Sequence, residues 1–576
     1  MSEPAITVSD PTAAPEQEPP FVAPAKSFLS HAKLIGFFTL ISRFMGLGRE
    51  IVAGHYLGTG LVAAAFTVAF TIPNLFRKLF GEGALSAAFI PLYAQSVKHD
   101  GPEQANDFAA AAVNLLCAIL LGIIVIGEVG IWLTITLGSS LWPDLMLTLK
   151  FTAIMLPYVL LICGGAFLSG ILQVHKKFGP PAAAPILLNV CHIIVLAIGA
   201  RVLHLGATRD PREIESIQAT LGFWLAFAVL VAGGLQVAVL LPALRATGFR
   251  FKLVPRFWTP GVRRMLKLTV PVALGAGVLQ LSVLMDKGLS MALMQRFDRD
   301  GNLLTHFTLL GQSIRFPMEA GAPRRLDIAQ FLYQFPLGVF AIALATAIFP
   351  ALSSDALDKD RDGFKSVLRN GLEATLWEGL PASLGLIIIS EPCIRLLFQH
   401  GQIDAHSATL IRSSLVFYAG AIWAFSLLQI INRAYYAIHD TVTPLVMSIV
   451  NIAVNLIVEI PLLWWLGEAG MAVGTLVSFS VQAIVMLLML DRKVGGLGIS
   501  ALARPAAKML AATAVMGLAL WAFQHSPLYP RGQTRGVWLA QLALLIALGA
   551  GVYLAACHAL RVATFRQLLP RRGRRQ

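Results

Sequence analysis

The stretch IVAGHYLGTGLVAAAFTVAFTIPNLF, residues 51–76, contains no Asp, Glu, Lys or Arg. It is longer than the roughly 20 residues that a helix needs to cross a bilayer. Further stretches without any of these charged residues are 151–175, 216–244, 328–354, 469–490, 509–530 and 536–560. Because backbone polar groups in lipid must be satisfied within the segment, apolar runs of this length are predicted to be helical.

The composition of the whole chain agrees with this prediction. Of its 576 residues, 56% are apolar and 13% are charged, and the mean hydropathy is +0.71. A soluble domain carries about twice that share of charge, so soluble enzymes, disordered proteins and fibres are excluded. The 45 Lys and Arg exceed the 31 Asp and Glu, but in a membrane protein this excess belongs in cytoplasmic loops, and no nucleic-acid partner is expected. The five scattered cysteines show no metal-binding spacing.

When a few charges are allowed inside helices, the sequence predicts an all-α polytopic membrane protein with fourteen transmembrane helices. The predicted spans are 33–56, 61–94, 108–137, 147–174, 181–205, 216–244, 265–296, 326–354, 368–391, 405–434, 441–466, 469–490, 505–525 and 536–560. If both termini lie inside, the inner loops carry more Lys and Arg than the outer loops do. This bias favours two cytoplasmic termini.

Two sequence matches indicate an internal repeat. His175–Pro180 matches His439–Pro444 at an offset of 264, and Phe70–Pro73 matches Tyr333–Pro336 at an offset of 263. Six spans separate the copies, so we expect two parallel six-helix lobes with a substrate site between them near the bilayer midplane. The predicted division is a disordered cytoplasmic tail, an N-lobe, a C-lobe, a pair of extra helices and a basic cytoplasmic tail, at residues 1–32, 33–245, 246–495, 496–560 and 561–576.

The first two spans contain charges that a lipid-facing helix would not carry. Arg43 and Arg49 lie in the first span, and Arg77 and Lys78 lie in the second. A charged group near the bilayer centre costs at least ~2.5–3.5 kcal/mol, so these cations are expected to face a water-filled cavity or each other. Snorkelling of side chains from helix ends is the alternative explanation, and it suits Lys78 best.

The spacing of these charges separates paired cations from candidate binding residues. Glu50 follows Arg43 by seven residues and shares its helical face, and Glu82 follows Lys78 by four and can pair with it. Arg49 and Arg77 have no obvious local partner. Because the arginine fork suits phosphate, a cavity lined by such residues implies an anionic substrate.

Further polar residues lie within later spans. Asp286 and Lys287 are expected to neutralise one another in part. Asn451 and Asn455 lie one helical turn apart and are expected either to bind a cation or to bridge helices. The chain lacks an HExxH motif and a nucleotide-binding loop, so transport driven by an ion gradient or by the membrane potential is favoured over ATP hydrolysis.

Several motifs together carry a family resemblance. They are Gly46-x-x-Arg49-Glu50, Pro73-Asn74-Leu75-x-Arg77-Lys78, Pro181-Ala182-x-Ala184-Pro185, Phe335-Pro336-x-Gly338-Val339, Leu397-Phe398-Gln399-x-Gly401 and Tyr436-Ala437-x-x-Asp440. From residue 33 onward the chain resembles the MurJ/MviN lipid II flippase family, which belongs to the multidrug/oligosaccharidyl-lipid/polysaccharide exporter superfamily.

This resemblance implies a transporter rather than an enzyme, with no cofactor. It implies two six-helix lobes around a V-shaped cationic cavity, and two last helices that line a groove for an undecaprenyl tail. The implied activity is alternating-access movement of lipid II, the undecaprenyl-pyrophosphate-linked peptidoglycan precursor, from the inner to the outer leaflet of a bacterial inner membrane. Membrane lipids and cell-wall synthesis proteins are the further partners to consider.

The resemblance also implies site residues. The substrate-binding residues would be Arg43, Arg49, Arg77, Lys78 and Glu82. The nearest matches to a cation site are Asp286, Asn451 and Asn455, and a monovalent cation, the membrane potential or both would drive the cycle.

The sequence departs from the family pattern in the eighth span and leaves alternatives open. The family usually has Ala-Asp-Arg shortly before the Phe-Pro step, where this chain has Ala329-Gln330-Phe331. Arg324 and Arg325, in the enlarged preceding loop 297–325, are candidate replacements for the arginine. The alternative functions are a flippase for another undecaprenyl-linked glycan, a membrane enzyme acting on polyprenyl phosphates, and a scaffold for cell-wall synthesis that transports nothing.

Overall fold

The computed structural model describes residues 25–138, 142–252, 258–298, 300–339, 341–357 and 360–564. Within the predicted tails, residues 1–24 and 565–576 lie outside the described residues. The first helix begins at Ala25, so it takes in the last part of the predicted N-terminal tail.

Helices form the N-terminal part of the chain. They are α1 (Ala25–Leu57), α2 (Leu61–Phe76), the π-helix η1 (Arg77–Ala84), α3 (Leu85–His99), α4 (Pro102–Leu137), α5 (Pro143–Met155), α6 (Tyr158–Val174), α7 (Gly179–Val202) and α8 (Pro211–Arg245). We call this set the N-terminal group.

The remaining helices follow a linker. They are α9 (Pro260–Ala292), α10 (Ala322–Val339), α11 (Ala341–Leu357), α12 (Arg361–Leu397), α13 (Ala405–Gly420), α14 (Ile422–Ala437), α15 (Val442–Leu466), α16 (Ala469–Lys493), α17 (Ile499–His525) and α18 (Arg535–Ala559). We call α10–α16 the C-terminal group.

Local sequence explains where many of these helices begin. The Asp210 side chain accepts a hydrogen bond from the backbone N–H of Arg212, and Pro211 occupies the first helical position of α8. Asp404 caps α13 in the same way, by accepting from the backbone N–H of Ser407 at 2.8 Å. Such caps satisfy backbone donors that have no partner within the helix, and proline tolerates the first position because its missing N–H is not needed there.

The fourteen predicted spans each correspond to one helix or to one run of helices. Within the described residues, eight helices are long and apolar enough to cross a membrane, and eleven spans result if each of three bent helix pairs counts as one. The other three predicted spans correspond to α1 and α9, which have 33 residues each, and to the run α2–η1–α3. These three segments carry most of the charges that the sequence analysis singled out.

Helix breaks confirm the predicted internal repeat. The α5–α6 and α13–α14 pairs both bend by 41°, and their second helices begin at Tyr158 and Ile422, which are 264 residues apart. The helix α2 ends at Phe76 and α10 ends at Val339, which are 263 residues apart. These offsets equal those of the two sequence matches.

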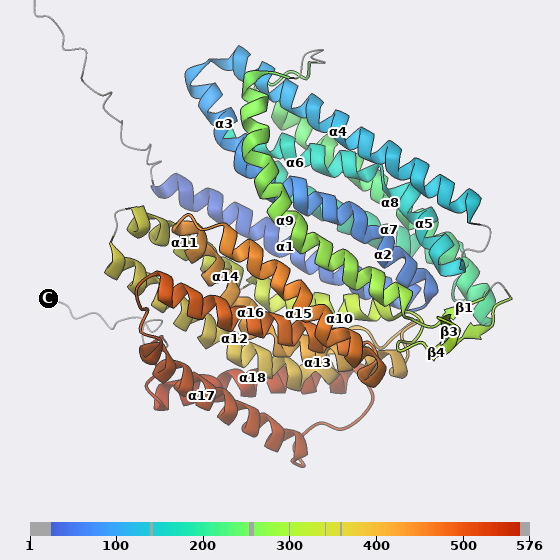
Figure 1. Cartoon of the computed structure of the whole chain (residues 1–576). Coiled ribbons are helices and arrows are strands. Elements are labelled where there is room, and N and C mark those ends of the chain that lie inside the picture. The colour runs from blue at the N-terminus through green and yellow to red at the C-terminus, as the bar shows by residue number, and fades with distance from the viewer. Residues whose placement is uncertain are drawn as a thin grey trace, which may run out of the picture.

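The two groups lie side by side, as Figure 1 shows. In the N-terminal group α7 packs against α1 and α8, and in the C-terminal group α16 packs against α15 and α13. The helix α9 runs along the seam, where it contacts η1 and α3 on one side and α15 and α10 on the other. The last two helices, α17 and α18, pack against each other and against α12, at the lower edge of the view.

The groups also contact each other at the end of the bundle where α1 reaches Leu57, which we call the Leu57 end. There His55 Nδ1 lies 3.0 Å from His400 Nδ1. Nearby, Thr59 Oγ1 donates a hydrogen bond to Ser407 Oγ at 3.1 Å. The two groups are therefore held together by polar contacts at this end.

The linker before α10 contains short strands that the sequence analysis did not predict. The strand β1 (Arg296–Phe297) pairs with β2 (Leu303–Leu304), and β3 (His306–Leu309) pairs with β4 (Gln312–Arg315), both antiparallel. The Arg296 guanidinium carbon lies 5.3 Å from the ring centroid of Trp142, the residue before α5. This linker therefore reaches back to the N-terminal group at the Leu57 end.

Candidate functional site

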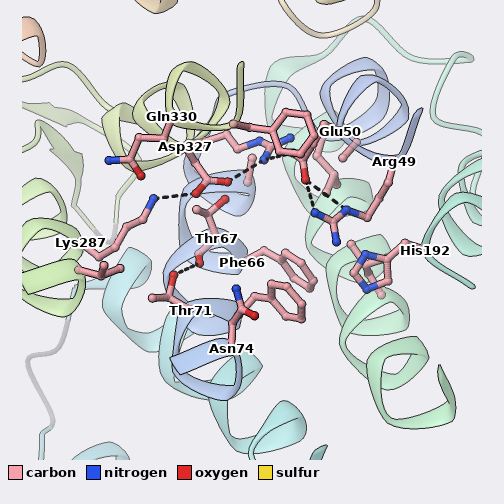
Figure 2. A pocket seen from close by; sticks show the side chains of 18 of the residues that line it. Arg49, Glu50, Phe66, Thr67, Thr71, Asn74, His192, Lys287, Asp327 and Gln330 are labelled. Carbon is pink, nitrogen blue, oxygen red and sulfur yellow. Dashed lines mark hydrogen bonds and ion pairs between the residues drawn. The ribbon is translucent and has the colours of Figure 1, made fainter. Parts of the chain in front are cut away.

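A cavity of about 240 Å³ lies between the N-terminal and C-terminal groups (Figure 2). Its charged lining residues are Arg49, Glu50, Lys78, Lys287, Arg324 and Asp327. Its other polar lining residues are Thr67, Thr71, Asn74, His192, Gln280, Gln330 and Gln334. Four basic and two acidic side chains give the described lining a formal charge of +2. Such a cavity is suited to an anion that carries further hydrogen-bonding groups.

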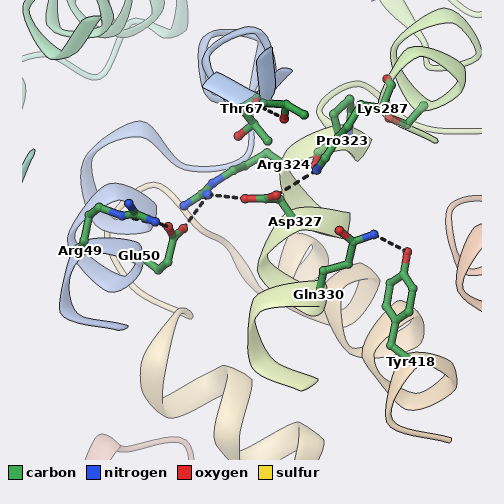
Figure 3. Close-up of polar contacts among 11 residues, drawn as sticks. Arg49, Glu50, Thr67, Lys287, Pro323, Arg324, Asp327, Gln330 and Tyr418 are labelled. Carbon is green, nitrogen blue, oxygen red and sulfur yellow. Dashed lines mark hydrogen bonds and ion pairs between the residues drawn. The ribbon is translucent and has the colours of Figure 1, made fainter. Parts of the chain in front are cut away.

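A chain of ion pairs crosses this cavity from α1 to α10 and α9 (Figure 3). Arg49 Nη2 lies 2.5 Å from Glu50 Oε1, and Glu50 Oε2 lies 2.7 Å from Arg324 Nη1. Arg324 Nη1 lies 3.4 Å from Asp327 Oδ2, and Asp327 Oδ1 lies 2.9 Å from Lys287 Nζ. Positive and negative groups therefore alternate across the seam between the two groups.

The partners of Glu50 correct the prediction made for the first span. Glu50 was expected to share a face with Arg43, and Arg49 was expected to have no local partner. In the structure Glu50 accepts from Arg49, its direct neighbour, and from Arg324 on the opposite group. Neighbouring residues on a helix do not face each other, but the long arginine side chain reaches back to the carboxylate.

The partners of Lys287 extend a second prediction. Asp286 and Lys287 were expected to neutralise one another in part, and the charge of Lys287 does act on Asp286. The direct ion pair of Lys287 is with Asp327 on α10, one helix away. Asp286 meets Asn455 on α15, whose Nδ2 lies 3.4 Å from its Oδ1. Adjacent positions on α9 point in different directions, so each side chain finds its partner on another helix.

Arg324 and Arg325 lie in the first turn of α10 rather than in a loop. Gly321, directly before the helix, allows this start. Its φ of +86° favours glycine, and a Cβ at that position would overlap the Thr59 carbonyl oxygen. Arg324 then lines the cavity, while Arg325 pairs with Glu468 at 2.8 Å and is 3% exposed. Of these two arginines, Arg324 is the one whose guanidinium lines the cavity.

Arg324 retains one unused donor. Its side chain is 7% exposed, and its Nη2 has no hydrogen-bond partner among the described residues. A buried donor without a partner costs about 1–3 kcal/mol. The structure therefore places an arginine donor that could serve an anion at the seam between the groups.

The other predicted substrate residues are distributed around the cavity. Lys78 lines it, whereas Arg43 and Arg77 are not among its lining residues. Arg77 Nε donates to Asn74 Oδ1 at 2.9 Å, and Asn74 does line the cavity. Glu82 lies within η1, but the structure does not describe its side chain. Arg77, Lys78 and Glu82 belong to the π-helix η1, a rare kind of element that often marks functional sites.

Arg43 contacts the C-terminal group directly. Its guanidinium lies against Gly338 near the end of α10, so closely that a Cβ at Gly338 would overlap it. The neighbouring Phe44 ring lies 5.9 Å from the Phe335 ring, measured between centroids. Arg43 is therefore held at the seam rather than against lipid.

The predicted cation residues lie together on α9 and α15. Asn455 Nδ2 donates to Glu459 Oε2 at 2.9 Å as well as to Asp286, and Ser478 Oγ donates to Asn455 Oδ1 at 3.4 Å. Asn451 Nδ2 is buried without a hydrogen-bond partner among the described residues. Asn455 thus bridges helices. Glu459 joins the same hydrogen-bonded group, and its signal in the sequence is a charged residue inside the predicted span 441–466. No group of three or more His, Cys, Asp or Glu able to hold a metal ion was found among the described residues.

Other residues of the cavity were not predicted from sequence. Asp327 is three residues after Arg324 on α10 and could have been recognised as its partner by this spacing. Gln330, which replaces the family's Asp, lines the cavity and donates to the Tyr418 hydroxyl at 3.0 Å. His192 is 3% exposed, lines the cavity and has an Nε2 without a partner among the described residues. No local pattern in the sequence distinguishes His192 from a structural histidine.

Comparison with known proteins gives consistent results. The profile of the family described as "Lipid II flippase MurJ" matches residues 53–530. The "Probable lipid II flippase MurJ" of Rhizobium tropici is 32% identical over 527 residues, which cover 90% of this chain and 92% of that protein. The "Lipid II flippase MurJ" of Burkholderia cenocepacia is 30% identical over 468 residues, which cover 79% and 82%.

Solved structures show the same fold. The structure titled "Lipid II flippase MurJ, inward closed conformation" matches with a TM-score of 0.71 at 22% identity and covers 92% of this chain and 99% of that one. An inward-facing multidrug resistance MATE family transporter of the MOP superfamily matches with a TM-score of 0.60 at 14% identity, covering 81% and 98%. These likenesses concern the arrangement of helices.

Proposed function

Because the chain belongs to the MurJ family, we propose that it moves lipid II from the inner to the outer leaflet of a bacterial inner membrane by alternating access. The chain is a multi-pass membrane protein and a transporter, not an enzyme. Its two groups of helices would rock about the cavity between them, exposing it first to one side of the membrane and then to the other.

The observation that carries this proposal is the pair of arginines that the two groups contribute to one cavity. Arg49 comes from α1 and Arg324 from α10, and both meet Glu50. A pyrophosphate offers several charged oxygens, and arginine forks bind such groups with two parallel hydrogen bonds. The amide and hydroxyl side chains of the cavity could then bind the polar remainder of the headgroup.

The size of the cavity indicates that the transport cycle must enlarge it. Pockets for drug-sized ligands measure ~300–1,000 Å³, and the cavity has about 240 Å³. A disaccharide that carries a peptide is larger than such a ligand. Substrate entry therefore requires the N-terminal and C-terminal groups to separate around the cavity.

We propose that both termini lie in the cytoplasm, as the charge of the loops predicts. The helix α1 then runs outward, and the Leu57 end lies on the outer side of the membrane. The contacts of His55 with His400 and of Thr59 with Ser407 would hold the outer side closed. Opening to the outside would require these contacts to break.

The lipid tail and the driving force can be assigned to other parts of the chain. The helices α17 and α18 carry apolar side chains that are more than half exposed, among them Leu518, Trp521 and Leu539, and this surface would suit a polyprenyl chain. A monovalent cation at Asp286 and Asn455, the membrane potential, or both would reset the cycle. Glu82 would neutralise the cavity cations after the substrate leaves.

Two assays test the proposed function. The gene should rescue a strain depleted of its own lipid II flippase, and the purified chain should move labelled lipid II across vesicle membranes. Absence of both activities would overturn the proposal. If the vesicles move another undecaprenyl-linked glycan but not lipid II, the substrate assignment is wrong and the transport class stands.

A further inference from the structure

A second cavity lies at the Leu57 end, and we call it the outer pocket. Its volume of about 610 Å³ falls within the ~300–1,000 Å³ of ligand sites. The described residues that line it are His55, Tyr56, Ala200, Arg201, His204, Leu205, Gly206, Ala207, Gly401 and Gln402. None of them also lines the cavity between the groups. The outer pocket is therefore a separate candidate site.

The outer pocket carries an uncompensated positive charge. No Asp or Glu is found among its described lining residues, which include Arg201 and two histidines. Arg201 is exposed, and within the described part of the chain its side chain makes no hydrogen bond or ion pair. The acid that follows in the loop of Gln402, Asp404, is engaged in capping α13. A concave site lined by one sign of charge concentrates ions of the opposite sign, so the outer pocket suits an anion.

Close contact between the two groups of helices completes the outer pocket. The backbone N–H of Gln402 donates to the His55 carbonyl oxygen at 3.0 Å. Gly401 has a φ of +63°, and a Cβ at this position would overlap the His55 backbone and ring. Glycine thus allows the loop before α13 to lie directly on α1. Since this loop belongs to the C-terminal group, the outer pocket is complete only while the Leu57 end is closed.

The outer pocket also borders the membrane. The α7 side chains of Ile194 and Ile198 are about half exposed, on a helix long and apolar enough to cross a bilayer. Arg201 follows them by seven and three residues and so lies on the same lipid-facing side. In the proposed orientation Arg201 lies at the outer end of α7, where the positive-inside rule predicts few cations. A phosphate attached to a lipid of the outer leaflet can therefore approach Arg201 from the membrane.

We propose that the outer pocket binds the pyrophosphate of a lipid that has reached the outer leaflet, after the Leu57 end has closed. The Arg201 fork would bind the phosphate oxygens, and His204 and the Gln402 amide would donate further hydrogen bonds. A ligand that binds only the closed arrangement favours it, so binding would oppose return of the lipid to the cavity. This inference rests on the proposed function and adds a site on the product side of transport.

A cysteine in the outer pocket can report its occupancy. Ala207 lines the pocket and is exposed, so A207C can react with a membrane-impermeant maleimide added outside phosphatidylcholine vesicles. The reporter is placed in the full-length chain with its five native cysteines replaced by alanine, and this parent is first tested for lipid II movement. Labelling is followed with no addition, with external inorganic pyrophosphate, and with undecaprenyl pyrophosphate in the vesicles, at an ionic strength matched with sodium chloride.

Three substitutions in this parent separate the site from general charge effects. Arg201→Gln removes the cation, and Arg201→Lys keeps the charge without the planar fork. Arg209→Gln is the matched control, because Arg209 is an exposed arginine in the same connection between α7 and α8 and does not line the outer pocket.

Both inorganic pyrophosphate and undecaprenyl pyrophosphate should slow labelling of the parent and of Arg209→Gln. Arg201→Gln should require at least about tenfold more inorganic pyrophosphate for the same protection, because it loses a charge-assisted hydrogen-bonded pair. Arg201→Lys should require an intermediate concentration.

If Arg201→Gln is protected at the parental concentration, or if Arg209→Gln loses protection equally, the site is overturned. If inorganic pyrophosphate protects and the lipid does not, the outer pocket binds a free phosphate and the lipid assignment is overturned. If protection depends on Arg201 but the parent moves no lipid II, the proposed function fails and the anion site stands.

Discussion

At the scale of single residues, Glu50 and Arg324 show what the sequence could and could not reveal. The sequence indicated that cations in the first two spans face a cavity, and Arg49 and Lys78 do line it. Arg324 was one of two candidates to replace a missing arginine. Its pairing with Glu50, 274 residues away, has no local signal, because it depends on how two helices pack.

Removing Arg324 should affect stability as well as transport. Arg324→Ala leaves Glu50 buried with a single partner, and breaking a buried ion pair costs about 3–5 kcal/mol. We expect a clear fall in the thermal unfolding temperature of the purified chain. The control is Arg412→Ala, because Arg412 is about half exposed and lies 3.8 Å from Glu391; it should change stability by ~0.5 kcal/mol or less. Equal effects of the two variants would contradict the buried role.

Gly338 should matter because of Arg43. Gly338→Ala would place a Cβ where the Arg43 guanidinium lies, and the flexible arginine would be displaced while the backbone stays in place. We expect lipid II movement to fall about as much as in Arg43→Ala. In the double variant the second change should add little, because the two residues act through one contact.

Gly385→Ala is the matched control for this prediction. Gly385 lies inside α12, and a Cβ there would meet nothing within 4 Å. It should leave lipid II movement unchanged. If Gly338→Ala also moves lipid II at the parental rate, the position of Arg43 against Gly338 is without importance for transport.

At the scale of helices, hydropathy predicted the spans well because lipid requires long apolar segments with internally paired backbones. The internal repeat was predicted from two short matches, and the breaks that begin α6 and α14 follow the same offset. Hydropathy says little about tertiary packing, so the place of α9 along the seam and the short strands before α10 could not be predicted.

The contact between His55 and His400 should make the Leu57 end sensitive to pH. Burial lowers the pKa of the His400 imidazole, and nearby Arg535 and His55 add to this effect against the hydrogen bond to the Leu397 carbonyl. The stability gained from neutral His400 is full above the ordinary histidine pKa of about 6.5 and declines as the pH falls below it. We expect the unfolding temperature to fall between about pH 7.5 and about pH 5.5.

His400→Gln should reduce this loss of stability, because glutamine keeps a hydrogen-bonding side chain that does not titrate. His525→Gln is the control, since His525 bonds to the Trp521 carbonyl at the end of α17, away from the seam. The prediction is wrong if the unfolding temperature of His400→Gln falls as much as that of the parent over this pH range.

At the scale of the whole molecule, the two groups are joined at the Leu57 end and enclose a cavity that is small for the proposed headgroup. Family membership could be inferred from the sequence because motifs such as Gly46-x-x-Arg49-Glu50 are short, continuous stretches of the chain. Whether the Leu57 end is open or closed could not be inferred from the sequence, because the same sequence must adopt several relative positions of its lobes during a transport cycle.

Locking the Leu57 end should stop transport. The hydroxyl oxygens of Thr59 and Ser407 lie 3.1 Å apart, so cysteines at both positions have sulfur atoms within reach of a disulfide. In a chain without native cysteines, oxidation of the T59C, S407C double variant should abolish lipid II movement, and a reductant should restore it. Each single cysteine variant serves as control, and undiminished movement by the oxidised double variant would contradict alternating access at this end.

The central claim is that guanidinium groups from both groups of helices bind the pyrophosphate of a lipid substrate as it crosses the membrane. Its most direct test is the rate at which vesicles containing Arg49→Gln, Arg324→Gln or the parental chain move labelled lipid II. The account predicts that each substitution slows movement at least about tenfold, since each removes a charge-assisted pair worth roughly 1.5–3 kcal/mol. Parental rates in both variants, with correctly inserted protein, would contradict it.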